Sequence, residues 1–182
     1  RAVTISYLLL RIADTFEDNI YQTEEEKITA LSSLAGIFEG NKDLEERLHL
    51  YESLKFLWQE KSSEKDLVEN GDRVLKCYYS LPAVYQRIID PLLMESIEGM
   101  ARFQRRKLVC PSKIFQLKDL KDLEQYCYYV AGVVGIILTR IFSLDEGISP
   151  KKSELERYQV EFGLALQLTN ILKDWQKDLK RG

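Results

Sequence analysis

The residues best suited to chemistry lie near the start of the chain, where an acidic segment directly follows an apolar one. Arg11, Asp14, Glu17 and Asp18 come after the run Ile5–Leu10. At about 3.6 residues per helical turn, the Arg and both Asp residues share an arc of roughly 60°, with Glu17 at its edge. Carboxylates four residues apart repel each other, and a bound divalent cation removes that repulsion. The segment therefore predicts a site for a hard cation such as Mg²⁺.

A second polar stripe at the far end of the chain strengthens this prediction. Taken alone, the first acidic segment is more typical of a solvated helix end. However, Gln167, Asn170, Asp174 and Asp178 follow one another at spacings of three, four and four residues, on a segment rich in Leu and Ile. At about 3.6 residues per turn they share a face roughly 80° wide. Two such helices facing each other across a cavity would bind several metal ions and a diphosphate.

Three motifs together resemble those of a known family. They are Leu8–Asn19, Gln167–Gly182, and the segment Tyr126–Gly135, with the sequence Tyr-Cys-Tyr-Tyr-Val-Ala-Gly-Val-Val-Gly. In order and spacing they are similar to the two Asp-rich motifs and the Tyr-Cys-x-x-Val-Ala-Gly-x-Val-Gly signature of the squalene/phytoene synthase family. The Asp-Thr-x-Glu-Asp form of the first motif and the segment Tyr126–Phe142 resemble the squalene synthases more than the phytoene synthases.

The resemblance implies an enzyme that condenses two prenyl diphosphates head to head with the help of Mg²⁺. Farnesyl diphosphate is the favoured substrate, giving presqualene diphosphate and squalene, and phytoene or dehydrosqualene synthesis is an alternative. Squalene formation also needs NADPH, but the sequence contains no Gly-x-Gly-x-x-Gly element that would support a nicotinamide site. A non-catalytic assembly or scaffold factor is a rival hypothesis. A head-to-tail prenyltransferase or class I terpene cyclase is another, which the Tyr126–Gly135 motif disfavours.

The resemblance also implies roles for individual residues. Diphosphate is a good leaving group only when metal ions and cationic side chains neutralise its charge, so the site needs metal ligands and phosphate-binding groups. The residues expected to be catalytic are Tyr126, Asp14, Asp18, Asp174 and Asp178. Those expected to bind the substrate diphosphate are Arg11, Lys173, Gln167 and Asn170. The expected metal ligands are Asp14, Glu17, Asp18, Asn170, Asp174 and Asp178.

Two residues of the last motif depart from the family pattern. Lys177 stands where the family usually has Glu, so a cation replaces a potential ligand. Lys173 stands where Arg is usual, which exchanges a bidentate phosphate fork for a point charge. Both changes would weaken binding at the second motif, and they keep the scaffold hypothesis open.

The composition is that of an ordinary globular protein and excludes several other kinds of site. Of 182 residues, 45% are hydrophobic and 30% charged, and a net charge of −3 without a basic stripe argues against a nucleic-acid partner. The single histidine, His49, argues against His-based metal sites and Ser/His or Cys/His catalysis. We expect it at the surface or half-buried. The three unpatterned cysteines predict free thiols in a reducing compartment.

The ends of the chain and its apolar runs set expectations about location. We find no signal peptide and no apolar run of the ~18–20 residues that a membrane span needs. We therefore expect a cytoplasmic location or the cytosolic face of a membrane, with peripheral association for product release. The chain begins without Met and stops just after a motif. We expect residues 1–182 to form a single all-α prenyl-diphosphate synthase domain that is truncated at both ends.

Helical spacing dominates the chain, with only four prolines and nine glycines to interrupt it. We expect an all-α, isoprenoid-synthase-like helical bundle around a central apolar cavity, present here as a partial domain. The helices are predicted over 3–19, 24–39, 44–60, 67–80, 82–107, 120–142 and 154–182, with loops at 61–66, 110–117 and 144–153. Pro91 should kink or break the fifth helix.

Two short segments carry open interpretations. The basic segment Arg105–Lys107 has two interpretations. Basic residues that complement the dipole at a helix C-terminus are favoured over a diphosphate-binding site. The small residues Ala131, Gly132 and Gly135 indicate close helix packing, room for an isoprenoid tail, or both.

Overall fold

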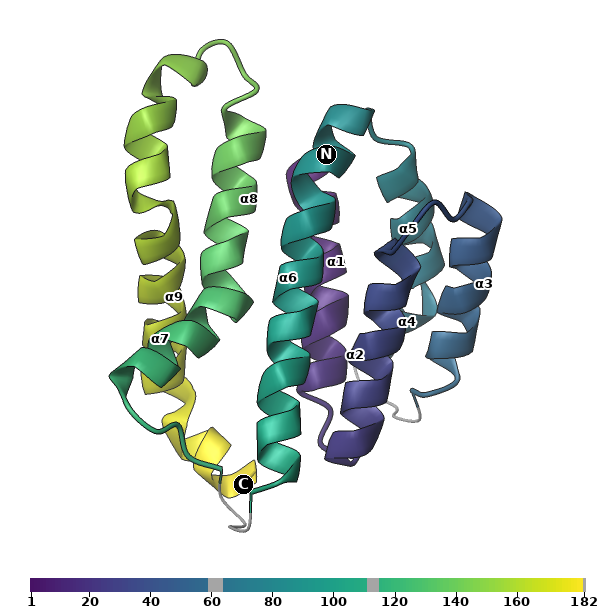
Figure 1. Cartoon of the computed structure of the whole chain (residues 1–182), viewed down its shortest axis with the longest axis vertical. Helices are drawn as coiled ribbons and strands as arrows, with labels where there is room; N and C mark the ends of the chain where they lie inside the picture. The colour runs from purple at the N-terminus through teal and green to yellow at the C-terminus, as the bar shows by residue number, and fades with distance from the viewer. Residues whose placement is uncertain (59–63, 111–114, 182) are drawn as a thin grey trace.

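The computed structural model describes residues 1–58, 64–110 and 115–181, with side chains described as far as Gln176 (Figure 1). The described residues form helices and no strands, so the all-α prediction is confirmed. The α-helices are α1 (Ala2–Glu17), α2 (Glu24–Phe38), α3 (Leu44–Lys55), α4 (Lys65–Glu69), α5 (Gly71–Tyr79), α6 (Ala83–Leu108), α7 (Leu120–Cys127), α8 (Val133–Phe142) and α9 (Lys152–Arg181). The π-helix η1 (Tyr128–Gly132) joins α7 to α8, and the 3₁₀-helix η2 (Ser149–Lys151) precedes α9.

Helices α1 and α6 form the middle of the bundle (Figure 1). Helix α6 contacts α1, α2 and α8, and α1 also contacts α5. The hairpin of α8 and α9 lies on one side of this central pair, and α2 to α5 lie on the other (Figure 1). The central pair therefore connects the first acidic motif, at the end of α1, to both halves of the bundle.

The ends of α2 are fixed by local chemistry that the sequence predicts. Thr23 and Glu26 form a reciprocal capping box at its start, and a Thr followed three residues later by a Glu is the sequence signature of this motif. Gly40 follows the helix with a φ of 65°, a left-handed conformation that favours glycine. The Arg47 guanidinium then donates hydrogen bonds to the carbonyls of Ile37 and Gly40.

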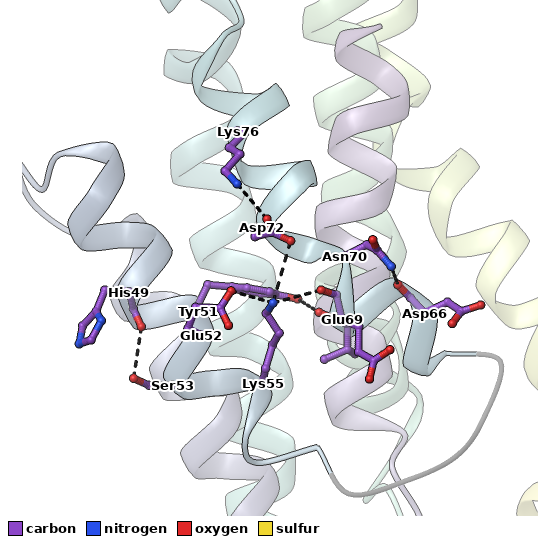
Figure 2. Close-up of polar contacts among 11 residues, drawn as sticks. His49, Tyr51, Glu52, Ser53, Lys55, Asp66, Glu69, Asn70, Asp72 and Lys76 are labelled. Carbon is purple, nitrogen blue, oxygen red and sulfur yellow. Dashed lines mark hydrogen bonds and ion pairs between the residues drawn. The ribbon is translucent and has the colours of Figure 1, made fainter.

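The junction of α3, α4 and α5 explains why the predicted fourth helix is two helices. The fully buried Tyr51 hydroxyl donates a hydrogen bond of 2.8 Å to the Val68 carbonyl (Figure 2). A Cβ at Gly71 would lie 1.9 Å from that hydroxyl oxygen, so the backbone passes too close for a side chain. Lys55 joins the same junction through Glu52, at 2.7 Å, and the Glu69 carbonyl.

Several other boundaries differ from the predictions. Helix α3 ends at Lys55 rather than residue 60. Helix α6 continues unbroken through Pro91, which lies on its exposed side while its neighbours Ile89, Leu92 and Leu93 are buried. The predicted loops at 61–66 and 110–117 fall partly on 59–63 and 111–114, outside the described residues. His49 is exposed and points away from the polar contacts around it, as expected (Figure 2).

The predicted helix over 120–142 is interrupted by η1. Ser96 on α6 donates a hydrogen bond of 2.7 Å to the Tyr129 carbonyl within this π-helix. In the described part of the chain, Leu120–Phe142 is long and apolar enough to cross a membrane, which differs from our expectation that no segment reaches that length. A core helix meets the same criterion, and 44% of its apolar window is buried.

Helices α8 and α9 approach each other through glycines. A Cβ at Gly135 would lie 1.9 Å from the Gln159 carbonyl oxygen, and one at Gly163 would lie 2.3 Å from the Ala131 carbonyl oxygen. Both contacts are with backbone, which cannot swing aside as a side chain can. The close-packing interpretation of this region is therefore confirmed.

We expect Gly135→Ala to destabilise the protein by about 1–3 kcal/mol, because the new methyl group must push α8 and α9 apart. The matched control is Gly36→Ala on α2, where nothing lies within 4 Å of the added Cβ. That change should stabilise the protein by about 0.5–1 kcal/mol through helix propensity alone. Urea unfolding of both variants tests this, and equal effects would contradict the close approach.

Candidate functional site

The two polar stripes meet at one cavity. A pocket of about 570 Å³ lies between the end of α1 and the facing side of α9, with α7 and η1 contributing to its wall. It is lined by Arg11, Asp14, Glu17, Asp18, Tyr126, Val130, Gln167, Asn170, Ile171 and Asp174. Three motifs that lie far apart in the sequence therefore contribute to a single site.

One predicted site residue, Lys173, does not join this group. Lys173 is exposed and does not line the pocket, although Asp174 beside it does. One residue corresponds to about 100° of rotation on a helix, which is enough to turn a neighbouring side chain to a different face. The side chain of Asp178, like that of Lys177, lies outside the described residues.

The carboxylates of α1 are held in place by the opposite face of the same helix. Ile12, Ala13 and Phe16 are buried in the core, with exposed fractions of 0–1%. Asp14 and Glu17 alternate with these anchors and are partly buried, and Asp18 is exposed. The apolar run predicted from sequence thus fixes where the acidic side chains can go.

Burial and crowding make Asp14 and Glu17 hard to ionise. Burial is the main cause that raises the pKa of Asp14 to about 7, with Asp18 adding to the rise and Arg11 opposing it. Burial and the charge of Asp18 also raise the pKa of Glu17 well above its usual range. In the metal-free protein these two carboxyls therefore keep a proton up to about neutral pH, and a bound cation would favour their ionised forms.

Arg11 lies at the mouth of the pocket. Its guanidinium is 3.8 Å from a carboxylate oxygen of Asp14 and 3.6 Å from one of Glu64. The side chain is 38% exposed, so it can reach a ligand entering from solvent.

Tyr126 lies next to the acidic side chains. The charge of Glu17, followed by burial, raises the pKa of its phenol well above the ordinary value. Its ring contacts Phe103 edge-on, with 5.3 Å between the centroids. The phenol is therefore neutral, and its ring is held against the wall of the pocket.

A second, more apolar cavity of about 290 Å³ adjoins the first and shares with it Arg11, Asp14, Gln167 and Asn170. The remaining walls come from α1, η1, α8 and α9, and they are formed by Tyr7, Leu10, Ala131, Val134, Gly135, Leu138, Phe162, Gly163 and Leu166. The small residues therefore bring the helices together and also leave space beside the polar pocket.

The groups that face the pocket suit a hard cation. The ligand atoms that they offer are oxygens of carboxylates, of amides and of the Tyr126 phenol, and a bound cation would favour ionisation of Asp14 and Glu17, whose pKa values are raised by burial. Mg²⁺ typically uses only one or two protein carboxylates and fills its other positions with water and phosphate oxygens. Within the described ranges, no three His, Cys, Asp or Glu side chains come close enough to hold a metal ion by themselves. A diphosphate would thus have to supply part of the coordination.

The basic cluster at the end of α6 has structural partners. Arg106 donates two hydrogen bonds, of 2.6 and 2.5 Å, to the carboxylate of Asp122 on α7. Lys107 forms an ion pair of 3.2 Å with Glu24 on α2. Arg105 is exposed. These contacts fit the structural role that the sequence favours for Arg105–Lys107 over diphosphate binding. The partners of Arg106 and Lys107 are specific side chains, in addition to the helix dipole.

Sequence reasoning missed Gln104. This α6 residue is 5% exposed and donates a hydrogen bond of 2.6 Å to Glu17. A signal was present, because Gln104 continues the spacing of the apolar residues Leu93, Ile97 and Met100. A polar residue at such a position requires a buried partner.

Comparison with known proteins agrees with this geometry. A model of the squalene/phytoene synthase family matches residues 1–182. The chain belongs to this family. Among its relatives, the squalene synthase of Mus musculus is 30% identical over 181 residues, covering 100% of this chain and 38% of the relative. Squalene synthase ERG9 of Gibberella zeae is 32% identical over 180 residues, covering 99% and 36%.

A third relative, the squalene synthase of Dictyostelium discoideum, is 30% identical over 179 residues, covering 98% of this chain and 38% of the relative. The chain thus spans a little over a third of the length of the curated relatives that it matches. The family predicted from the three motifs is confirmed.

The pKa of Asp14 leads to a prediction for the metal-free protein. Its pKa rises from 3.8 to about 7 on folding, so between these pH values the folded state keeps a proton that the unfolded state has lost. Stability therefore falls as the pH rises from about 4 to about 7. We expect Asp14→Asn to raise the free energy of unfolding by about 1–2 kcal/mol at pH 8, discounted for the 33% exposure of the side chain, and to change it little at pH 4.

Urea unfolding with a chelator, across this pH range, measures the effect. Glu161→Gln, at an exposed position of α9 that lines neither pocket, is the control and should leave the pH profile unchanged. An Asp14→Asn profile that parallels the wild type would show that Asp14 ionises without penalty.

Proposed function

We propose that the protein containing this chain condenses two prenyl diphosphates head to head with the help of a divalent metal ion. The observation that supports this most strongly is the single pocket where carboxylates of α1 face the amides and carboxylate of α9, beside an apolar cavity. Such a pairing of polar and apolar space suits a molecule with a charged diphosphate head and a hydrocarbon tail.

In this proposal the oxygen atoms of both helices hold the metal ions. Asp14, Glu17 and Asp18 contribute from α1, and Asn170, Asp174 and Asp178 contribute from α9. When bound, Mg²⁺ would neutralise the charge that develops on the departing diphosphate. Without that charge, the crowded carboxylates would repel the diphosphate rather than bind it.

The remaining polar groups orient the diphosphate. Arg11, at 38% exposure, supplies a cationic guanidinium at the pocket mouth, and Gln167 and Asn170 supply amide N–H donors. We also assign Lys173 to this group, although its side chain is exposed and does not line the pocket.

The apolar walls and Tyr126 would protect the reacting carbons. An allylic cation survives only where water is excluded, and the lining of the second cavity by Leu, Val and Phe side chains supports such exclusion. The Tyr126 ring lines the pocket and can stabilise a nearby cation through its π face. Its raised pKa keeps the phenol neutral, so no phenolate is present to attack that cation.

We propose farnesyl diphosphate as the substrate, and squalene or presqualene diphosphate as the product. Three relatives named squalene synthase, at 30–32% identity, support this choice over phytoene or dehydrosqualene formation. We further propose that NADPH supplies the reducing step, that residues 1–182 are part of one prenyl-synthase domain, and that the protein works in the cytoplasm or at the cytosolic face of a membrane into which its product is released.

Incubation of the full-length protein with Mg²⁺ and either farnesyl or geranylgeranyl diphosphate tests the substrate. We expect presqualene diphosphate from farnesyl diphosphate without NADPH, and squalene when NADPH is added, with products identified by mass spectrometry. Preference for geranylgeranyl diphosphate would instead indicate phytoene formation.

A non-catalytic scaffold is the second candidate, and the exposed position of Lys173 together with Lys177 in place of Glu favours it. It predicts a folded protein that turns over neither substrate. The same incubations, with circular dichroism to verify the fold, therefore separate the two candidates.

We expect Asp14→Ala and Asp174→Ala each to lower kcat by about 10²–10³-fold, because each removes charge that the metal and diphosphate require. Both variants should keep the helical circular dichroism spectrum of the wild type. Glu161→Ala on α9 is the control and should retain full turnover, since its exposed side chain lines neither cavity. Unchanged rates in either aspartate variant would reject the site.

A further inference from the structure

The central helix α6 contributes one polar contact to the acidic site. The Nε2 atom of Gln104 donates a hydrogen bond of 2.6 Å to Oε1 of Glu17, across 87 positions of sequence. Within the described residues, the other oxygen of Glu17, Oε2, accepts no hydrogen bond. One half of the carboxylate is thus fixed to α6, while the other half remains available on a side chain that lines the pocket.

Gln104 occupies a core position at the end of an apolar stripe. It is 5% exposed and follows Leu93, Ile97 and Met100, which are 0–1% exposed, at spacings of four, three and four residues. Its own acceptor atom, Oε1, is buried with no hydrogen-bond partner among the described residues. Burying an unpaired acceptor is unfavourable. An apolar side chain of similar size would therefore suit the packing better, and the contact with Glu17 is what the amide adds.

The neighbouring lysines pair with Glu24 and not with Glu17 among the described residues. Lys27 on α2 lies 3.9 Å from Oε2 of Glu24, and Lys107 on α6 lies 3.2 Å from Oε1 of Glu24. Neither lysine forms an ion pair with Glu17 in the part of the chain that the structure describes. Glu17 is therefore oriented by a neutral amide, which fixes one oxygen of its carboxyl group and leaves the other available to a cation.

We propose that Gln104 is a positioning residue, whose amide N–H holds Glu17 in the orientation that binds a divalent cation in the pocket between α1 and α9. This inference rests on the proposed function, since it requires that the pocket binds the metal. It extends the site to helix α6, which supplies no residue to the pocket lining.

The test compares Gln104→Met with a matched glutamine on the same helix. Gln86 donates hydrogen bonds to the carbonyls of Tyr79 and Leu81 at the α5–α6 turn, where it has a structural role and lines neither cavity of the site. Mn²⁺ uptake by the full-length protein is measured by electron paramagnetic resonance with inorganic diphosphate present, and thermal unfolding is measured with a chelator.

We expect Gln104→Met to bind Mn²⁺ at least about tenfold more weakly, with a thermal midpoint equal to or above that of the wild type. Gln86→Met should show the reverse, with a lower midpoint and unchanged Mn²⁺ affinity. The two variants thus distinguish a residue that orients the metal-binding side chain of Glu17 from one that stabilises the fold.

Two results would overturn the inference alone. One is wild-type Mn²⁺ affinity in Gln104→Met, and the other is a fall in its midpoint as large as that of Gln86→Met, which would give Gln104 a structural role. Wild-type protein that takes up no Mn²⁺ even with diphosphate present would overturn the proposed function and this inference with it.

Discussion

The burial of carboxyl groups at the end of α1 is the constraint on which the site depends. Asp14, Glu17 and Asp18 cannot move apart, because the other face of the helix is fixed in the core by Ile12, Ala13 and Phe16. Burial raises the pKa of Asp14 to about 7, so the folded chain holds this charge at a cost to its own stability. A ligand that brings positive charge would offset this cost, as the proposed divalent-metal site requires.

The second half of the site depends on how closely α8 and α9 can pack. Gly135 lets the backbones of α8 and α9 meet, and Gly163 lets α9 meet η1. The polar stripe of α9 then faces α1, with a more apolar cavity beside it. A side chain at either glycine would separate the hairpin and alter both spaces at once. Packing and binding are thus set by the same residues, and neither can be changed independently.

Helix α6 connects these parts. It contacts α1, α2 and α8, and its basic end is held by the pairs that Arg106 and Lys107 form with α7 and α2. Those ion pairs join the C-terminal end of α6 to α7 and to α2. The same helix can therefore present Gln104 to Glu17 with a hydrogen bond of 2.6 Å.

The sequence by itself determined the helical class, the Thr23 cap and the two polar stripes, because helical periodicity decides which residues share a face. It also indicated the family, through three motifs in order. Only the tertiary structure decided that Lys173 lies outside the pocket lining, that η1 interrupts the helix over 120–142, and that Gln104 meets Glu17. These depend on how helices rotate against one another, which is set by packing between residues far apart in sequence, and periodicity within one helix carries no information about it.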